Sequence, residues 1–149
     1  MQDQTIRLVR SSWQRVEPIA PTAAALFYDN LFAADPALQP LFKGDMQQQG
    51  HKLMQMIGAA VARLDELPAL VPVLEGLAVR HVGYGVQPAH YDTVGQALLK
   101  TLSQGLGEHF TPPVRQAWTE VYGLIAAVMI RAAAQEPALA SAASSPSCA

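Results

Sequence analysis

Hydrophobic residues recur every three or four positions along most of the chain, which is the spacing of one buried face of an α-helix. Ile6, Val9, Trp13 and Val16 form the first such stripe and predict a helix over residues 4–18. Later stripes predict helices over residues 22–34, 46–64, 67–82, 87–106 and 112–134, with a short helix from 36 to 42. Strand-like alternation and repeats are absent, so the pattern predicts an all-α fold.

Polar caps and prolines set the expected boundaries of these helices. Asp3 or Thr5 is expected to cap the first helix, and the prolines at positions 18 and 21 are expected to end it. At positions 35–36 and 111–112, an Asp or Thr stands directly before a proline, the usual pairing of an N-cap with the first helical residue. Residues 135–149 are rich in Ala, Ser and Pro and are predicted to form a disordered tail. One folded domain is therefore expected over residues 1–134.

The composition shows spare apolar surface. Of the 149 residues, 50% are hydrophobic and 15% are charged, whereas charged residues make up about 25% of a typical soluble domain. This surplus suits a larger core, an oligomer interface or an apolar ligand. A net charge of −2, without blocks of like charge, argues against nucleic acid or an anionic membrane surface as the main partner.

Three further features bear on where the protein acts. The longest uncharged apolar run, residues 122–130, is shorter than the ~20 residues of a membrane span, so none is expected. The N-terminus lacks the apolar core of a signal peptide. The single cysteine, Cys148, cannot form an internal disulfide, which fits a reducing compartment. We therefore expect a cytoplasmic protein.

Candidate chemistry narrows to one histidine. The four histidines, at positions 51, 81, 90 and 109, have neither zinc nor di-iron spacing, and Gly83–Gly85 does not continue into a phosphate-binding loop. A lone histidine is more often a core or surface residue than a ligand. His81, however, ends an apolar helix, and Tyr28 and Gln49 are expected to lie opposite it, with Phe42 at the edge. Such a pocket would hold a flat apolar cofactor by one nitrogen and leave a polar site opposite.

Several short motifs, in their order and spacing, resemble the globin family over about residues 3–133. They are Leu26–Phe32, Asp35-Pro36 followed by Leu41-Phe42, Glu66–Leu70, Arg80-His81, Pro88–Gly95 and Ala117-Trp118 leading to Val121–Gly123. The chain is most similar to single-domain bacterial globins that resemble the haem domain of flavohaemoglobins. Among these it is similar to globins with tyrosine and glutamine in the distal pocket, of the kind found in thermoacidophilic methane oxidisers. The resemblance implies a globin fold of six to eight helices around haem b, and a globin domain over residues 1–134.

On the proximal side of the haem, the resemblance implies that His81 binds the iron. Leu77, Tyr91 and Val94 are expected to contact the cofactor from this side. In flavohaemoglobins, the tyrosine that Tyr91 matches works with a glutamate of the last helix to polarise the proximal histidine. Ala133 stands where that glutamate is expected, so the resemblance does not imply strong electron donation from a polarised proximal histidine to the iron.

On the distal side, the resemblance implies that Tyr28 and Gln49 face the bound gas. Phe42 and Leu53 are expected to pack on the porphyrin, and Lys52 to reach a haem propionate. His51 is a competing distal residue, but it lies about 200° around the helix from Gln49 and is expected to face outward. His90 and His109 are interpreted as surface residues.

Two functions follow from the resemblance, and the sequence leaves both open. The first is reversible binding of O2 and other diatomic gases such as NO and CO, for oxygen storage, transport or delivery. The second is nitric oxide detoxification, in which a nitric oxide dioxygenase converts NO and O2 to nitrate. That reaction needs electrons, so a separate reductase is the expected partner. Gas or redox sensing is a third class, although no signalling domain is attached.

Overall fold

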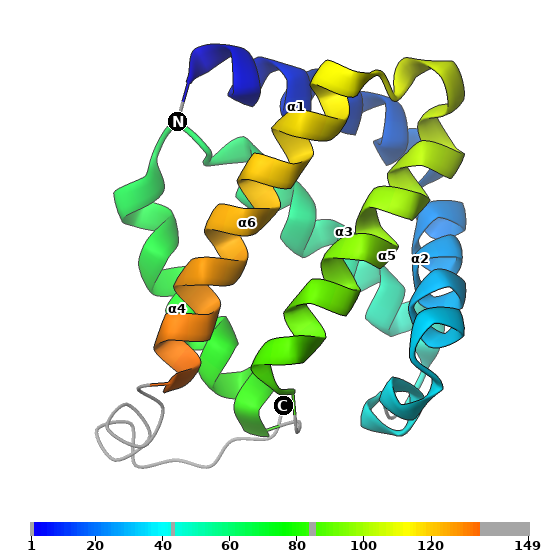
Figure 1. The fold of residues 1–149 in the computed structure, drawn as a ribbon, viewed down its shortest axis with the longest axis vertical. Coiled ribbons are helices and arrows are strands. Elements are labelled where there is room, and N and C mark those ends of the chain that lie inside the picture. The colour runs from blue at the N-terminus through cyan, green and yellow to red at the C-terminus, as the bar shows by residue number, and fades with distance from the viewer. Residues whose placement is uncertain (1, 43, 84–85, 135–149) are drawn as a thin grey trace.

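The computed structural model describes residues 2–42, 44–83 and 86–134, and within them the chain forms α-helices, short 3₁₀ helices and no strand (Figure 1). The all-α fold with six to eight helices is confirmed. The predicted disordered tail, residues 135–149, lies outside the described residues. In chain order the elements are α1 (Asp3–Val16), η1 (Glu17–Ile19), α2 (Ala20–Ala34), η2 (Pro36–Leu41), α3 (Met46–Ala62), α4 (Leu67–Gly83), α5 (Pro88–Leu106), η3 (Gly107–His109) and α6 (Pro112–Ala134).

Two predicted helix starts differ in outcome. Asp35 caps η2, because its carboxylate accepts a hydrogen bond from the backbone N–H of Ala37 at 3.1 Å. The predicted cap of the first helix is wrong: Gln2 is the N-cap and makes no side-chain bond, while Asp3 and Thr5 lie inside α1. The Thr5 hydroxyl instead donates to Glu120 Oε2 at 3.1 Å, which ties α1 to α6.

The short third segment is a 3₁₀ helix and not an α-helix. Pro40 lies inside η2 and has no N–H to donate to the carbonyl of Pro36 four residues earlier. In an α-helix its ring would also clash with that carbonyl, and the backbone bonds here follow the tighter i→i+3 pattern, from Leu38 N–H to the Asp35 carbonyl and from Phe42 N–H to the Gln39 carbonyl, both at 3.1 Å. η2 ends at Leu41, and Phe42 follows as its C-cap with its ring edge-on to Tyr28 and Phe32 of α2, both at a centroid distance of 5.4 Å.

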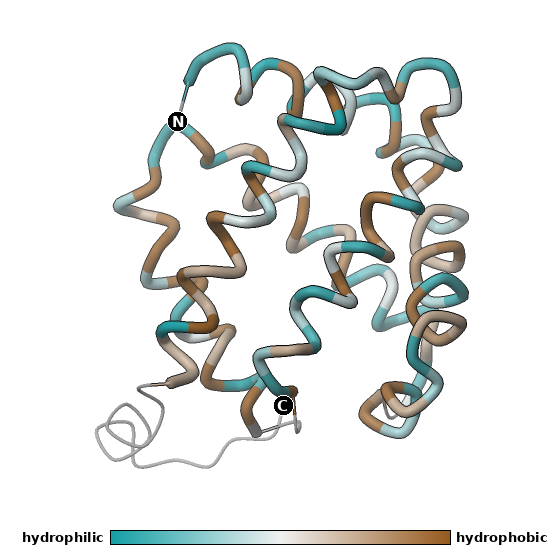
Figure 2. Tube along the Cα trace, in the orientation of Figure 1, coloured by the Kyte–Doolittle hydropathy of each residue, from teal (hydrophilic) through white to brown (hydrophobic). Residues whose placement is uncertain are grey.

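The helices enclose two hydrophobic clusters. α2 packs on α5 and α3, α6 packs on α1 and α4, and the brown apolar segments of each helix alternate with teal polar ones along the trace (Figure 2). The larger cluster contains Val9, Trp13, Leu31 and Trp118, and is supplied mainly by α1, α2, α5 and α6. The smaller cluster lies between α4 and the C-terminal half of α6 and includes Leu70, Leu74, Ala78, Tyr91 and Met129.

Among the described residues, α6 is the one helix whose length and apolar composition would suffice to cross a membrane. In this structure Trp118, Val121 and Met129 of α6 are buried against α1 and α4, as in a core helix. Length and composition of this kind also occur in helices of protein cores. The expected absence of a membrane span stays a prediction.

Candidate functional site

His81 lies near the end of α4, half-buried, with its ring fixed by the helix itself. Its Nδ1 donates to the carbonyl of Leu77, one turn earlier, at 2.8 Å. A carbonyl can only accept, so Nδ1 carries the proton and Nε2 carries the lone pair that can bind a metal. Burial lowers the pKa of His81. The hydrogen bond to Leu77 raises this pKa, and the charge of nearby Arg80 lowers it further. A lowered pKa favours the neutral imidazole, which is the metal-binding form.

Tyr28 lies on α2 in a cluster of aromatic rings. Its ring stacks on Phe32 at a centroid distance of 5.9 Å and meets Phe27 and Phe42 edge-on at 5.3 and 5.4 Å. Burial raises the pKa of Tyr28 to about 12. The phenol therefore stays protonated across the physiological range and can act as a hydrogen-bond donor.

A glycine sets the distance between α2 and α3. A Cβ on Gly50 would lie 2.8 Å from Cβ of Ala24 and 3.7 Å from Cε2 of Tyr28. Only glycine allows this close approach. Gln49, directly before Gly50 and half-buried, is thereby held on the α3 turn that crosses Tyr28. An isolated glycine inside a helical pattern is the sequence signal that could have revealed the crossing.

The register of α3 separates the two distal candidates. Gln49 is half-buried, whereas His51 is exposed, as the helical register predicts. His51 lines a groove on the other side of α3, between that helix and α1. Lys52 is also exposed, so its ammonium group lies at the surface.

The four apolar candidates for cofactor contact are all only partly buried. Phe42, Leu53 and Val94 pack against the larger cluster, and Leu77 packs against the smaller one. They lie at the borders of the two clusters and not at their centres. Both clusters therefore present apolar side chains that can still bury surface against a flat apolar group.

Tyr91, near the start of α5, is buried and its hydroxyl has no hydrogen-bond partner among the described residues. Burial raises the pKa of Tyr91. Its backbone carbonyl accepts a hydrogen bond from the Tyr122 hydroxyl of α6 at 2.5 Å. The ring of Tyr122 packs so closely on Gly95 that a Cβ there would lie 2.7 Å from Cε2. Sequence reasoning missed Tyr122 as a residue that holds the start of α5 in place, because its partners Tyr91 and Gly95 are about thirty residues away.

The remaining histidines have other roles. His109 is exposed, with Nε2 3.3 Å from an Arg15 nitrogen. His90 is partly exposed, and its Nδ1 accepts a hydrogen bond from the backbone N–H of Gln87 at 2.9 Å, which caps α5. Within residues 2–42, 44–83 and 86–134, no three His, Cys, Asp or Glu side chains gather where they could hold a metal ion. His81 is therefore a candidate single ligand and not part of a multi-ligand protein site.

Comparison with known proteins identifies the family. The Globin family model matches residues 25–129. The chain belongs to the globin family. A flavohemoprotein of Vibrio cholerae is 34% identical over 128 residues, which are 84% of this chain and 32% of the relative. A flavohemoprotein of Bacillus subtilis is 32% identical over 133 residues, 87% of this chain and 33% of the relative. The globin thus spans about a third of the length of these relatives.

A solved structure supports the same assignment. It is an engineered carbene transferase made from a candidate nitric oxide dioxygenase of Rhodothermus marinus. The two structures align with a TM-score of 0.84 at 28% sequence identity, covering 95% of this globin and 99% of the other chain. The resemblance inferred from the sequence motifs is confirmed.

Membership of the globin family implies haem and gas binding, and the residues present fit a haem. His81 offers an imidazole whose tautomer is fixed by the Leu77 carbonyl. Tyr91 offers a buried hydroxyl without a protein partner among the described residues. Partly buried apolar side chains border both clusters. This donor set suits a cofactor that brings its own metal and needs one axial nitrogen from the protein.

Proposed function

We propose that this globin holds haem b through His81 and reversibly binds O2, CO and NO on the side of Tyr28 and Gln49. The observation that carries the proposal is the buried Tyr28 phenol, enclosed by aromatic rings and held protonated by a pKa raised to about 12. When bound, haem supplies an iron atom that takes diatomic gases as ligands.

The chain's own residues would then act in four ways. The Leu77 carbonyl holds the His81 ring in one tautomer and aims Nε2 away from the helix backbone. Phe42, Leu53, Leu77 and Val94 exclude water from the cofactor faces. The Tyr28 hydroxyl donates to the gas ligand, and in a dry pocket such a bond gains strength. The exposed Lys52 would pair with a propionate.

Absorption spectra of the purified protein test this proposal. With haem added, we expect a Soret band that moves between the ferric, ferrous and O2-exposed samples and returns when O2 is removed. The same titration on a His81→Ala variant should leave most haem unbound. Haem bound equally well by that variant would contradict the assignment of the axial ligand.

The alternative function is nitric oxide dioxygenase activity, which converts NO, O2 and one electron to nitrate. The relatives favour it: two flavohemoproteins, and a solved structure described as a candidate nitric oxide dioxygenase. The reaction consumes one electron for each NO, and we propose that a reductase supplies it.

A single-turnover experiment separates the two functions. The ferrous protein is exposed to O2, mixed with NO, and the nitrate formed is counted. Near-stoichiometric nitrate, followed by repeated turnover when a flavin reductase and NADH are supplied, supports the enzyme. Loss of NO without nitrate supports gas binding alone.

A further inference from the structure

The side of α6 that faces away from the other helices is apolar over several turns. In the most apolar 18-residue stretch of this helix, 39% of the residues are buried, so much of the stretch lies outside the core. No charged residue occurs between Glu120 and Arg131, and the exposed residues in that interval are Gly123, Leu124 and Ala127. Leu124 is one of three exposed large hydrophobic residues in the described part of the chain. We define Gly123, Leu124 and Ala127 as the α6 seam.

The seam has a charged residue of opposite sign at each end. Glu120, Leu124, Ala127 and Arg131 follow one another at intervals of three or four residues, which places them on one face of the helix. Glu120 accepts hydrogen bonds only from neutral side chains among the described residues. Arg131 makes no ion pair with a described residue. Both charges can therefore pair with groups of another molecule.

Gly123 is not required by packing within one chain. It lies inside α6, and a Cβ built on it would meet no heavy atom within 4 Å. Glycine inside a helix is less favourable than alanine, because it loses more backbone freedom on folding. At Gly50 and Gly95, by contrast, a Cβ would lie only 2.8 and 2.7 Å from a neighbouring side chain. A glycine at position 123 is explained if another helix approaches α6 from outside, because small residues let two backbones come close.

The apolar surface continues from α6 onto α4. Beside Leu124 lies a hollow of about 50 Å³ between the two helices. All the side chains that line it are apolar, including Leu67 and Val71 of α4. A hollow without polar groups is poorly hydrated, so covering it with apolar side chains is favourable.

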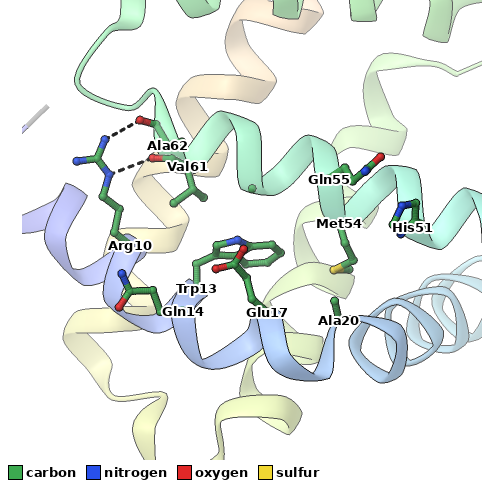
Figure 3. Close-up of a pocket in the computed structure, with 11 residues that line it drawn as sticks. Arg10, Trp13, Gln14, Glu17, Ala20, His51, Met54, Gln55, Val61 and Ala62 are labelled. Atoms are coloured by element: carbon green, nitrogen blue, oxygen red, sulfur yellow. Dashed lines mark hydrogen bonds between the residues drawn. The ribbon is translucent and has the colours of Figure 1, made fainter.

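The groove between α1 and α3 is larger, about 670 Å³, but its chemistry is different. Figure 3 shows Arg10, Glu17, His51 and Gln55 around it, and water can hydrate these polar and charged side chains. The α6 seam lies in a run of ten residues without a charged side chain. An apolar surface of this kind bounded by charged residues is typical of an interaction site.

We propose that the α6 seam binds the same seam of a second copy of this globin, with the two α6 helices antiparallel. A two-fold axis near residues 125 and 126 would set Glu120 of each chain opposite the partner's Arg131, and Leu124 opposite the partner's Ala127. A parallel pair would set like charges together, so the charges favour the antiparallel arrangement. Two helices in contact form an interface below the ~1,200 Å² of a standard complex, so the dimer should be weak. The inference does not depend on haem or on gas binding.

Sedimentation equilibrium of the purified full chain tests for the dimer. Between about 5 and about 500 µM protein, we expect the average mass to rise from the 16.0 kDa of one chain toward twice that value. Gly123→Ala adds a methyl group to the seam and should raise the dimer dissociation constant about tenfold while the chain stays folded. Gly76→Ala of α4, whose Cβ also meets nothing within 4 Å, is the matched control and should leave the dimer unchanged. A chain that stays monomeric at the highest concentration, or a dimer that Gly123→Ala does not weaken, overturns the proposal.

An exchange of charges tests the antiparallel orientation. Arg131→Glu and Glu120→Arg each create two like-charged pairs across the seam and should weaken self-association about tenfold or more. In an equimolar mixture of the two variants all cross-seam pairs are of opposite sign, so a heterodimer should form about as well as the unmodified dimer. Since Glu120→Arg also removes the bond from Thr5, Thr5→Val is its control and should dimerise like the unmodified chain. A mixture that stays monomeric would contradict the antiparallel seam.

Discussion

The two walls of the candidate haem site are built on different principles. The distal wall, which we define as Tyr28, Phe42, Gln49 and Leu53, is shaped by ring packing in and around the larger cluster and by the glycine crossing of α2 and α3. The proximal wall, defined as Leu77, His81 and Tyr91, borders the smaller cluster and is held by hydrogen bonds to backbone carbonyls.

This difference indicates which property each wall controls. Packing fixes the position of the distal phenol, so steric changes there should alter the distance of Tyr28 from a ligand. Hydrogen bonds fix the tautomer and orientation of the proximal imidazole, so polar changes there should alter how the cofactor is held. Each prediction below is directed at one wall and uses the other as its reference.

The largest effect is expected from His81→Ala in the proximal wall. Removing the imidazole that we propose binds the iron should weaken haem binding at least tenfold, because losing even a hydrogen-bond partner of a metal ligand costs about 10–100-fold. Haem content after gel filtration and a haem-transfer titration measure this. His109→Ala, at an exposed ring, should retain haem like the unmodified protein. Equal retention by both variants would remove His81 from the site.

Glycine-to-alanine changes compare the packing of the two walls. Gly50→Ala would bring its Cβ within 2.8 Å of Ala24 Cβ, and Gly95→Ala within 2.7 Å of the Tyr122 ring. Overpacking of this kind costs about 1–3 kcal/mol in free energy of unfolding. Urea denaturation measures the loss, and Gly123→Ala, in open space on the exposed side of α6, should instead be neutral or stabilising by up to about 1 kcal/mol.

The Gly50→Ala and Gly95→Ala variants also distinguish the two walls by their effect on gas binding. Gly50→Ala should also speed O2 dissociation, because it pushes α3 away from Tyr28, whereas Gly95→Ala should leave that rate near its original value. O2 dissociation that is equally fast in both variants would mean that the α2–α3 crossing does not position the phenol.

Tyr28→Phe tests the distal hydrogen bond directly. Losing a bond worth about 0.5–1.5 kcal/mol should speed O2 dissociation by up to about tenfold while CO dissociation changes less. Stopped-flow displacement measures both rates. Since burial raises the pKa of Tyr28 to about 12, its proton stays in place and the O2 rate should show no titration step between about pH 7 and 10. A step in that range, absent from the Tyr28→Phe variant, would contradict the buried position of the phenol.

Local signals were enough to predict the helices and several of their boundaries. Asp35, Thr111 and the prolines act within one turn of their own position, and the predicted ranges for the later helices agree with the structure to within a few residues. The range of α1 was predicted to within two residues, but its cap was not: the Thr5 hydroxyl instead meets Glu120, which is 115 residues away and outside any local pattern. The bond that caps α5, from the Gln87 N–H to His90 Nδ1, was also not predicted from the sequence.

The site itself was predictable only as a set of residues. From the family motifs we propose His81, Tyr28 and Gln49 as site residues, but those motifs do not reveal the contacts that hold these side chains in place. The Gly50 crossing and the Tyr122–Tyr91 bond both depend on how distant helices approach each other. Such geometry is set by packing between helices and leaves at most a weak mark in the sequence, such as a glycine at a helical position.

The smallest effect, and the one that decides most about the proximal wall, is expected from Tyr91→Phe. In the haem-free protein this change removes a buried hydroxyl without a described partner, so stability should stay equal or rise by up to about 1 kcal/mol. Tyr122→Phe is the matched control: it breaks the bond to the Tyr91 carbonyl and should cost about 0.5–1.5 kcal/mol. With haem bound, the sign for Tyr91→Phe should reverse if its hydroxyl serves the cofactor, and haem release should become faster. Urea denaturation with and without haem measures the change in free energy of unfolding in both states. If the two tyrosine variants lose equal stability in the haem-free protein, the Tyr91 hydroxyl already has a structural partner.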